Sequence, residues 1–374
     1  GTSIPRLALQ VDDDGYTNAT DHEYGGNVFK QDTSANTATF KRAIPSGQKV
    51  YMANVIFKTG ASFTGSSFNW DLQSSGTFIA DKCHWSGDFY FNGASAKSSI
   101  INNSVFKSDA TVAAVSLTNQ IQPPTTNNII INVLDDLGFN LSNSALAGTH
   151  RNLWVDVKNQ GASASIISTA NTSSAEIEQL IVTNYNTNTL SIEGAYSRAG
   201  FVSQSPNCSI KDYYCFVPMN PIYFAAGSGS SIVDNVRFQL GCREDLSQAI
   251  SINAFRAANT SNNTITNYHQ IKAGPIYSFG DAFTLLTGTA NNTLDNLLLK
   301  SGAASSGDNR WDNIVNDNGN SNRYNNIIVE GHTNDRAILT SVNSIGAAVT
   351  NLYFFGPTIR NLSNAYVTLQ MVEL

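Results

Sequence analysis

The feature that most constrains the fold is a short unit that recurs along nearly the whole chain. Each copy is an Asn followed by a short, mostly apolar run, as in residues 54–57, 128–131 and 326–329. The copies start at Asn54, Asn103, Asn128, Asn152, Asn235, Asn267, Asn296, Asn326 and Asn351, with Gln179 and Asp212 replacing Asn in two more. From Asn103 onward, neighbouring copies are about 23 to 33 residues apart. A period of this length is typical of a solenoid that stacks one structural unit on the next.

The unit predicts a right-handed, single-stranded parallel β-helix of about 12 coils. Asn tolerates the left-handed backbone conformation that a tight corner requires, and its amide can bond to the same residue in the neighbouring coil. The gap between Asn54 and Asn103 is about twice the period, so we expect a coil with a weaker copy between them. The fold class is therefore all-β.

Further strands are expected from short alternating runs bounded by Gly, Ser and Asn. They are residues 189–192, 221–224, 249–252 and 275–278, with a last strand within Asn364 to Leu374. Near the start, Thr37 to Ile44 predicts a helix, which Asp32 or Thr33 caps and Pro45 ends. We expect residues 1–50 to form an entry with this capping helix, and residues 51–374 to form the β-helix.

Composition excludes several functions. Only 13% of the 374 residues are charged, the net charge is -6 and no basic run occurs, so a nucleic-acid partner is not expected. No run of 18 apolar residues occurs, so no membrane span is expected. The four cysteines lack a CxxC pair and an accompanying His cluster, which indicates buried apolar side chains and no metal site or cofactor.

The entry into the repeat resembles a known family. Residues 32–60 read DTSANTATFKRAIPSGQKVYMANVIFKTG, which is similar to the D-T…A-I…G-x-x-V-Y-x-P entry of pectate-lyase-like β-helices, particularly bacteriophage tailspikes. The sequence departs from that pattern at Met52-Ala53, where the usual Pro is absent. The abundance of Asn, Ser and Thr agrees with the resemblance.

The resemblance to tailspikes implies a homotrimer of side-by-side β-helices in a phage virion, outside the host cell. It also implies a protein that binds a bacterial surface polysaccharide, such as capsule, O-antigen or exopolysaccharide. Proteins of this kind usually cleave the polysaccharide, so the resemblance implies a host-recognition enzyme, an endo-acting glycoside hydrolase.

Side-chain alternation places the second residue after each Asn on the outer face of the coil. This outward set is unusually apolar, and large exposed apolar patches mark interfaces or ligand sites. In its middle stretch Trp154, Tyr214, Arg237 and His269 suit a sugar, with aromatic faces for stacking and a cation for hydroxyl or carboxylate groups. The alternative interpretation of the whole set is packing between subunits.

Coil lengths indicate the same region, because extra residues in a coil leave it as a loop. The longest coils carry Glu193 and Tyr196, then Arg243, Glu244 and Asp245, then Asp281, so we expect a sugar-binding groove between about Trp154 and Asp281. Glycoside hydrolysis needs two carboxylates. The expected acid is Glu193, Glu244 or Asp281, and the expected base is Asp245 or Asp156, with Tyr196 and Arg243 helping to bind substrate. The alternative interpretation of each single carboxylate is a solvated loop charge.

Two other functions stay open at this stage. A polysaccharide lyase would use His269 or Tyr214 as a base and Arg237 to neutralise a uronate carboxylate. A receptor-binding adhesin would bind the polysaccharide without cleaving it. Hydrolysis remains the main expectation.

Overall fold

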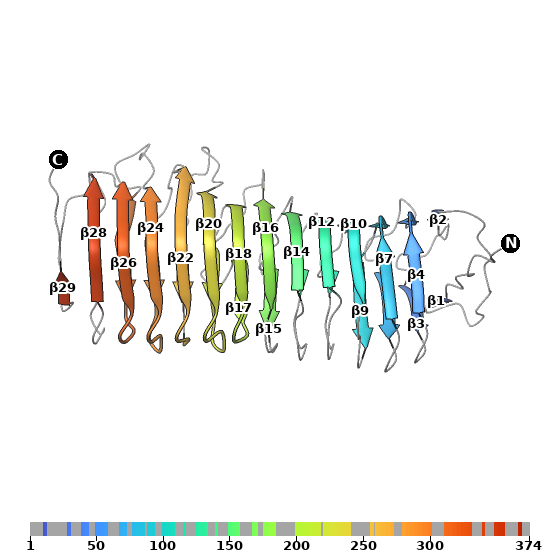
Figure 1. Ribbon diagram of the computed structural model, residues 1–374, viewed down its shortest axis with the longest axis horizontal. Coiled ribbons are helices and arrows are strands. Elements are labelled where there is room, and N and C mark those ends of the chain that lie inside the picture. The colour runs from blue at the N-terminus through green and yellow to red at the C-terminus, as the bar shows by residue number, and fades with distance from the viewer. Residues whose placement is uncertain are drawn as a thin grey trace.

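The computed structural model describes the strands of nearly every coil and many of the turns between them. The described residues are 10–12, 28–30, 39–44, 49–58, 67–72, 77–86, 88–93, 99–108, 115–116, 125–133, 139–140, 149–157, 167–170, 175–184, 199–217, 220–240, 255–257, 259–272, 279–300, 310–330, 339–340, 348–355 and 366–368. Within these residues every regular element is a strand, and the strands stack side by side along one long axis (Figure 1).

The strands form two sheets, whose neighbours are parallel except for one pair, β1 with β3. Sheet A contains β1 Gln10–Asp12, β3 Thr39–Ile44, β6 Ser67–Leu72, β9 Asp88–Gly93, β11 Val115–Ser116, β13 Phe139–Asn140, β15 Ile167–Ala170, β17 Ala199–Gln204, β19 Asn220–Phe224, β21 Phe255–Ala257, β23 Phe279–Leu285, β25 Arg310–Asp317 and β27 Leu339–Thr340. Sheet B contains β2 Val28–Lys30, β4 Lys49–Ala53, β5 Ile56–Lys58, β7 Thr77–Asp81, β8 His84–Ser86, β10 Ile100–Ser108, β12 Thr125–Val133, β14 Thr149–Val157, β16 Glu176–Asn184, β18 Ser209–Val217, β20 Ile232–Leu240, β22 Thr264–Lys272, β24 Thr293–Lys300, β26 Arg323–Glu330, β28 Ala348–Phe355 and β29 Tyr366–Thr368. Each coil contributes to both sheets, which defines a parallel β-helix and is consistent with the right-handed one predicted.

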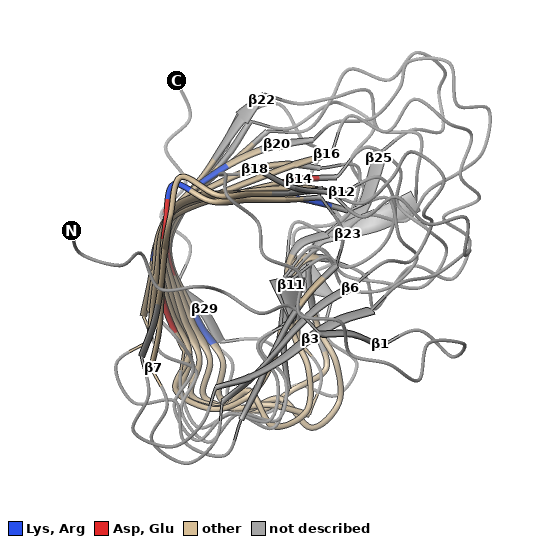
Figure 2. Ribbon diagram, turned by 90° about the vertical axis from the view of Figure 1, so that its right-hand side faces the viewer, with Lys and Arg blue, Asp and Glu red and all other residues tan. Residues whose placement is uncertain are grey.

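Each long strand of sheet B bends at a corner, so the sheet has two arms and covers two sides of the solenoid (Figure 2). The corner residue has a positive φ of 50° to 57° in twelve coils. These residues are Asn54, Lys82, Asn103, Asn128, Asn152, Gln179, Asp212, Asn235, Asn267, Asn296, Asn326 and Asn351. Because Asn is among the few side chains that tolerate this conformation, the repeat in the sequence marks the corners directly.

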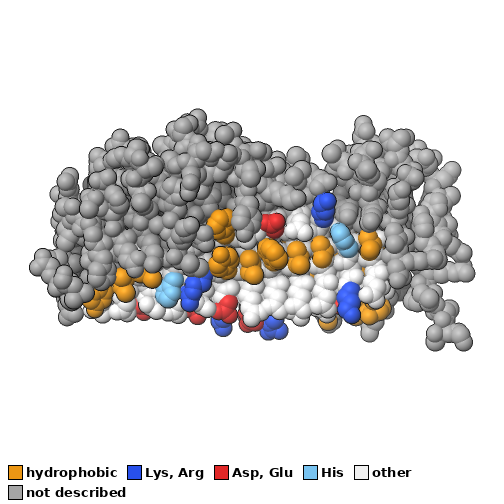
Figure 3. Space-filling model, turned by 90° about the horizontal axis from the view of Figure 1, so that it is seen from above, with side chains coloured by type: hydrophobic (Ala, Val, Ile, Leu, Met, Phe, Trp, Pro, Cys, Tyr) orange, Lys and Arg blue, Asp and Glu red, His pale blue; other side chains and the backbone are white. Residues whose placement is uncertain are grey.

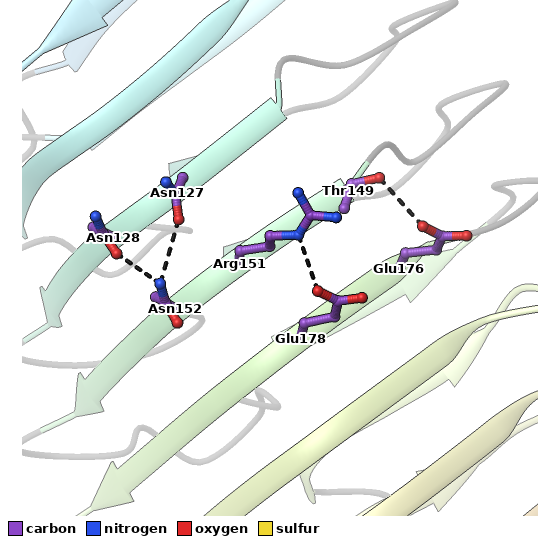
Figure 4. Close-up of polar contacts among 7 residues, drawn as sticks. All are labelled: Asn127, Asn128, Thr149, Arg151, Asn152, Glu176 and Glu178. Atoms are coloured by element: carbon purple, nitrogen blue, oxygen red, sulfur yellow. Dashed lines mark hydrogen bonds and ion pairs between the residues drawn. The ribbon is translucent and has the colours of Figure 1, made fainter.

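The corner side chains also bond to one another from coil to coil. Asn128 Nδ2 donates to Asn103 Oδ1 at 2.8 Å, and Asn152 Nδ2 donates to Asn128 Oδ1 at 2.7 Å. Figure 4 shows Asn152 reaching back to the preceding strand in this way. The same ladder continues near the far end, where Asn351 Nδ2 donates to Asn326 Oδ1 at 2.9 Å. The predicted Asn ladder is therefore present.

Substitutions at one corner separate the two contributions of Asn to stability, which are its hydrogen bond to the neighbouring coil and its tolerance of a positive φ. We expect Asn296→Ala to lose the 2.6 Å hydrogen bond to Asn267 and to strain a φ of 56°, whereas Asn296→Gly loses only the hydrogen bond. The left-handed conformation costs an L-residue about 1 to 2 kcal/mol, so the Ala variant should be the less stable by about 1 kcal/mol. Urea unfolding followed by circular dichroism measures the difference, and equal stabilities would contradict it.

A second, buried ladder lies inside the solenoid at another turn. Asn292 Oδ1 accepts from the backbone N–H of Asn263 at 3.0 Å, and Asn322 Oδ1 accepts from that of Asn292 at 2.9 Å. The amide groups of these three residues bond to one another as well, at 3.0 Å in both steps. All three side chains are buried, so the ladder satisfies polar backbone groups in the core.

Much of the core consists of the inward side chains of the two arms of sheet B. The residues just after each corner, such as Leu153, Leu180 and Tyr213, are buried, and so are those two positions further on, such as Val155 and Val182. Polar residues are buried as well: Ser104 lies just after the corner at Asn103, and His150, two positions before the corner at Asn152, places its Nδ1 2.9 Å from the buried Thr126 Oγ1. The core thus runs the length of the solenoid between the arms and sheet A (Figure 2).

The prediction of a helix at Thr37 to Ile44 is wrong. Thr39–Ile44 is β3, which pairs with β6 in parallel and with β1 in antiparallel. The segment carries aromatic and β-branched residues, and a run this short cannot be distinguished from a helix by its periodicity. Strands β2 and β3 of the predicted entry, residues 1–50, pair with strands of the first coils.

Other strand predictions have mixed outcomes. The strand at Pro221 to Phe224 is confirmed as β19, and the last strand is confirmed as β29, which pairs with β28. The strands predicted at residues 189–192, 249–252 and 275–278 lie outside the described residues.

Three of the four cysteines are buried and free, as predicted. Burial raises the pKa of the Cys215 thiol to about 12 and also raises that of Cys83. Both thiols are protonated at neutral pH and are therefore poor nucleophiles. Cys242 lies outside the described residues.

Candidate functional site

The outward side chains of the second arm of sheet B form one continuous row. The residue two positions after each corner pairs in register with its equivalent in the next coil. The row consists of Ile56, His84, Val105, Ile130, Trp154, Ile181, Tyr214, Arg237, His269, Leu298, Ile328 and Tyr353. Neighbours in it are about 4.8 Å apart, the spacing of paired strands. We call this set the outward row.

Most side chains of the outward row are apolar, and several of them are exposed. Trp154, Ile181 and Tyr214 are adjacent and are 42%, 39% and 36% exposed. Figure 3, which views this face from above, shows a stripe of hydrophobic side chains with basic and His side chains within it. The predicted face is therefore present, and its apolar centre leads directly into Arg237 and His269.

The row contains one residue that the sequence pattern missed. His84 belongs to the coil between Asn54 and Asn103, where Lys82 occupies the corner in place of Asn with a φ of 52°. Because Lys rarely adopts this conformation, the corner was not recognisable from its residue type. Apolar Cys83 and Trp85, one and three positions after Lys82, are the sequence signal that could have placed it.

A chain of hydrogen bonds links Trp154 to Asp156 through the next coil. The indole Nε1–H of Trp154 donates to Thr183 Oγ1 at 3.1 Å, and the hydroxyl of Thr183 donates to Asp156 Oδ1 at 2.6 Å. Thr183 pairs with Asp156 in register and is buried. Two of the predicted site residues, Trp154 and Asp156, thus share one polar partner.

Arg237 and His269 are register partners on β20 and β22. Both side chains are half-buried. Burial, and then the charge of Arg237, lower the pKa of His269 below its usual value of 6.5. The imidazole is therefore neutral at pH 7 and can accept a proton beside a fixed positive charge.

A β-bulge follows this pair. The register between β20 and β22 shifts after Phe238, so that Gln239 faces Lys272. Bulges are frequent beside functional sites, because the extra residue re-aims the side chains that follow. The extra residue, Ile271, comes two positions after His269 and distinguishes this part of the row from the regular coils before it.

The prediction that Asp281 lies in a loop is wrong, because its backbone pairs in sheet A. Asp281 is in β23 and faces Asn313 of β25, next to a register shift after Gly280. It follows that Asp281 belongs to the sheet opposite the one that carries the outward row. A catalytic role for its carboxylate stays a prediction.

The remaining predicted site residues lie outside the part of the chain that the structure describes. They are Glu193, Tyr196, Arg243, Glu244 and Asp245. Their segments, 185–198 and 241–254, directly follow β16 and β20, two strands of the row. Their roles as acid, base or binding residues stay predictions.

The acidic residues that precede the corners belong to the turns. Asp234 Oδ1 accepts from Thr266 Oγ1 at 2.6 Å and from Asn267 Nδ2 at 2.8 Å. The hydrogen bond from Thr266 is the main cause that lowers the pKa of Asp234. Asp295 accepts from Asn326 in the same way, and Arg151 pairs with Glu178 at 2.9 Å (Figure 4). These contacts stabilise neighbouring coils.

The described segments contain neither a metal-binding cluster nor a membrane-spanning helix. Within them, no three His, Cys, Asp or Glu residues gather closely enough to hold a metal ion. Nor do these segments contain a helix with the length and hydrophobicity needed to cross a membrane.

Comparisons with known proteins show no family for this chain. No family model and no curated protein matches the sequence. Among solved structures, the chain is similar to the A-module of the mannuronan C-5 epimerase AlgE4 from Azotobacter vinelandii, with 9% identity and a TM-score of 0.35. The match covers 86% of this chain and 91% of that one. Similarity at this level does not assign a function.

Proposed function

We propose that the protein binds a bacterial surface polysaccharide along the outward row, between Trp154 and His269. The proposal rests on one observation: side chains that suit a sugar lie next to one another on neighbouring strands of this stretch. Exposed Trp154 and Tyr214 offer flat apolar faces, and Arg237 and His269 follow directly with groups that bond to hydroxyls and carboxylates. Successive strands spaced by about 4.8 Å present these groups in a line, which suits an extended polymer.

The proposed activity is endo-hydrolysis of the bound polysaccharide by paired carboxylates. Retaining enzymes hold the two groups about 5 Å apart, and inverting enzymes about 6.5 to 9.5 Å apart. The segments that follow β16 and β20 carry Glu193, Glu244 and Asp245, and both strands belong to the row. One of these residues would act as the acid and another as the base.

A second candidate activity, a polysaccharide lyase, is favoured by Arg237 and His269. Neutral His269 would take the proton from the carbon next to a uronate carboxyl group, while Arg237 neutralises the carboxylate. The electron pair would then form a carbon–carbon double bond and expel the glycosidic oxygen. This chemistry requires a uronate-containing polymer.

The lyase candidate predicts a particular pH profile. A base with a lowered pKa stays neutral above that pKa, so kcat/KM should be full at pH 7 and fall only as the pH drops below the usual 6.5 of a histidine. His269→Gln should remove this acid limb along with most of the activity. An acid limb that survives in His269→Gln would contradict the assignment of the base.

One assay separates hydrolase, lyase and adhesin. Purified protein is incubated with a panel of capsular and O-antigen polysaccharides, while new reducing ends and the ultraviolet absorbance of unsaturated uronates are followed. Reducing ends alone support hydrolysis, and both signals together support the lyase. Binding without either signal means an adhesin, and no binding to any polysaccharide of the panel argues against the proposed function.

The homotrimer and the location in a phage virion, outside the cell, are proposals as well. Half-buried Val105 and exposed Ile328, which lie in the outward row on either side of the sugar-binding stretch, suit packing between subunits. Light scattering should then give three times the chain mass of 40.2 kDa. A mass of one chain would contradict the trimer.

A further inference from the structure

The hydrogen bonds around Trp154 tie its half-exposed indole to Thr183 and Asp156, which lie on the same outer face of sheet B, two positions further along their strands. Thr183 is 4% exposed and contacts both Trp154 and Asp156, at 3.1 Å and 2.6 Å. Trp154 is on β14, whereas Thr183 is on β16, so the bond crosses from one coil to the next. The indole is therefore tied to a side chain of the next coil that is itself buried.

The direction of each hydrogen bond is fixed by chemistry. Thr183 Oγ1 donates its single hydroxyl proton to Asp156 Oδ1. The lone pairs of Thr183 Oγ1 then remain for the indole N–H, which can only donate. Consecutive hydrogen bonds of this kind polarise and strengthen one another.

We propose that Thr183 and Asp156 are positioning residues, which hold the Trp154 ring in one orientation as a ready platform for a sugar. This inference rests on the proposed polysaccharide function and gives Asp156 a role other than the expected base. A ring already held in its binding orientation loses less conformational freedom when the ligand arrives. Thr183 would thus affect affinity without touching the sugar.

Trp154 fluorescence tests the positioning directly and needs no ligand. The Trp154 signal is obtained as the difference between each protein and its Trp154→Phe form, and quenching by acrylamide reports how freely the ring is reached. We expect stronger quenching in Thr183→Val and in Asp156→Ala, and a wild-type value in Thr183→Ser, which keeps the hydroxyl. Unchanged quenching in Thr183→Val would overturn the proposal.

Thr149→Val is the matched control. Thr149 Oγ1 also donates to a carboxylate of the next coil, Glu176, at 3.3 Å, but it lies on the first arm, before the corner at Asn152. Its loss should leave the Trp154 signal unchanged. A change as large as that of Thr183→Val would show a general loosening of the strands and would also overturn the proposal.

Binding to the best polysaccharide of the panel provides the second measurement. Thr183→Val should weaken binding by about fivefold, Thr183→Ser should restore it, and Trp154→Ala should weaken it further. Wild-type affinity in Thr183→Val would contradict the positioning role. Wild-type affinity in Trp154→Ala would refute the proposed sugar site itself, and the quenching result would then still decide whether Thr183 and Asp156 orient the ring.

Discussion

Replacement of Asn292 by Ala should destabilise the protein by about 3 to 5 kcal/mol, because it breaks the buried ladder in its middle. Asn292 Oδ1 accepts from the backbone N–H and the amide of Asn263, and its own amide donates to Asn322 Oδ1. The Ala side chain replaces none of these bonds. The N–H of Asn263 would be left without its acceptor inside the solenoid, where water does not substitute.

Asn296→Ala in the same coil is the matched control for this prediction. It removes an Asn from the exposed corner ladder and should cost about 1 to 2 kcal/mol, mainly through the left-handed backbone. Urea unfolding of both variants gives the comparison. An Asn292→Ala variant as stable as Asn296→Ala would mean that the buried ladder contributes no more than the exposed one.

The second large effect is expected at the sugar-binding stretch. Trp154→Ala should weaken polysaccharide binding by about 30-fold, since truncating a central aromatic anchor typically costs about 2 kcal/mol. Tyr214→Ala should act in the same direction. Trp154 and Tyr214 are two strands apart, about 10 Å, so they contact different parts of an extended polymer and their effects should nearly add.

Tyr51→Ala is the control for the loss of an exposed aromatic side chain. Tyr51 is 63% exposed but lies on the first arm, before the corner at Asn54. Isothermal titration calorimetry with one polysaccharide should show wild-type affinity for this variant. If Tyr51→Ala weakened binding as much as Trp154→Ala, the polymer would not be confined to the outward row.

The exposed corner ladder could be predicted because one residue type repeats for a clear physical reason. Positive φ and coil-to-coil bonding both select Asn, so the corners are visible in the sequence. From the corners, alternation places the outward row correctly, because a strand has a period of two residues. The row required no knowledge of the turns that connect the coils.

Other features could not be recognised in the sequence, because the residue type at the positive-φ position varies from coil to coil. The buried ladder of Asn263, Asn292 and Asn322 follows residues with positive φ at 262, 291 and 321, but those residues are Asn, Asn and Ser. A search for an αL-tolerant residue followed by Asn at a spacing of 29 to 30 residues could have found it. The coil between Asn54 and Asn103 was expected from the spacing, but Lys82 hid the position of its corner, and with it His84.

The link between Trp154 and Thr183 could not be predicted from the sequence. The two residues are 29 positions apart, and their contact depends on the register of β14 and β16 and on the side-chain conformation of an indole. Short segments such as Thr39–Ile44 have a related ambiguity. Their structure is decided by pairing with β6, which local sequence does not show.

The most direct test of the proposed function is a crystal structure with an oligosaccharide from the polysaccharide that the protein binds. The proposal predicts sugar rings along the outward row, stacked on Trp154 and Tyr214, with hydroxyl or carboxylate groups at Arg237 and His269. An oligosaccharide bound on sheet A, or on the first arm beside Tyr51 and Ile232, would contradict it.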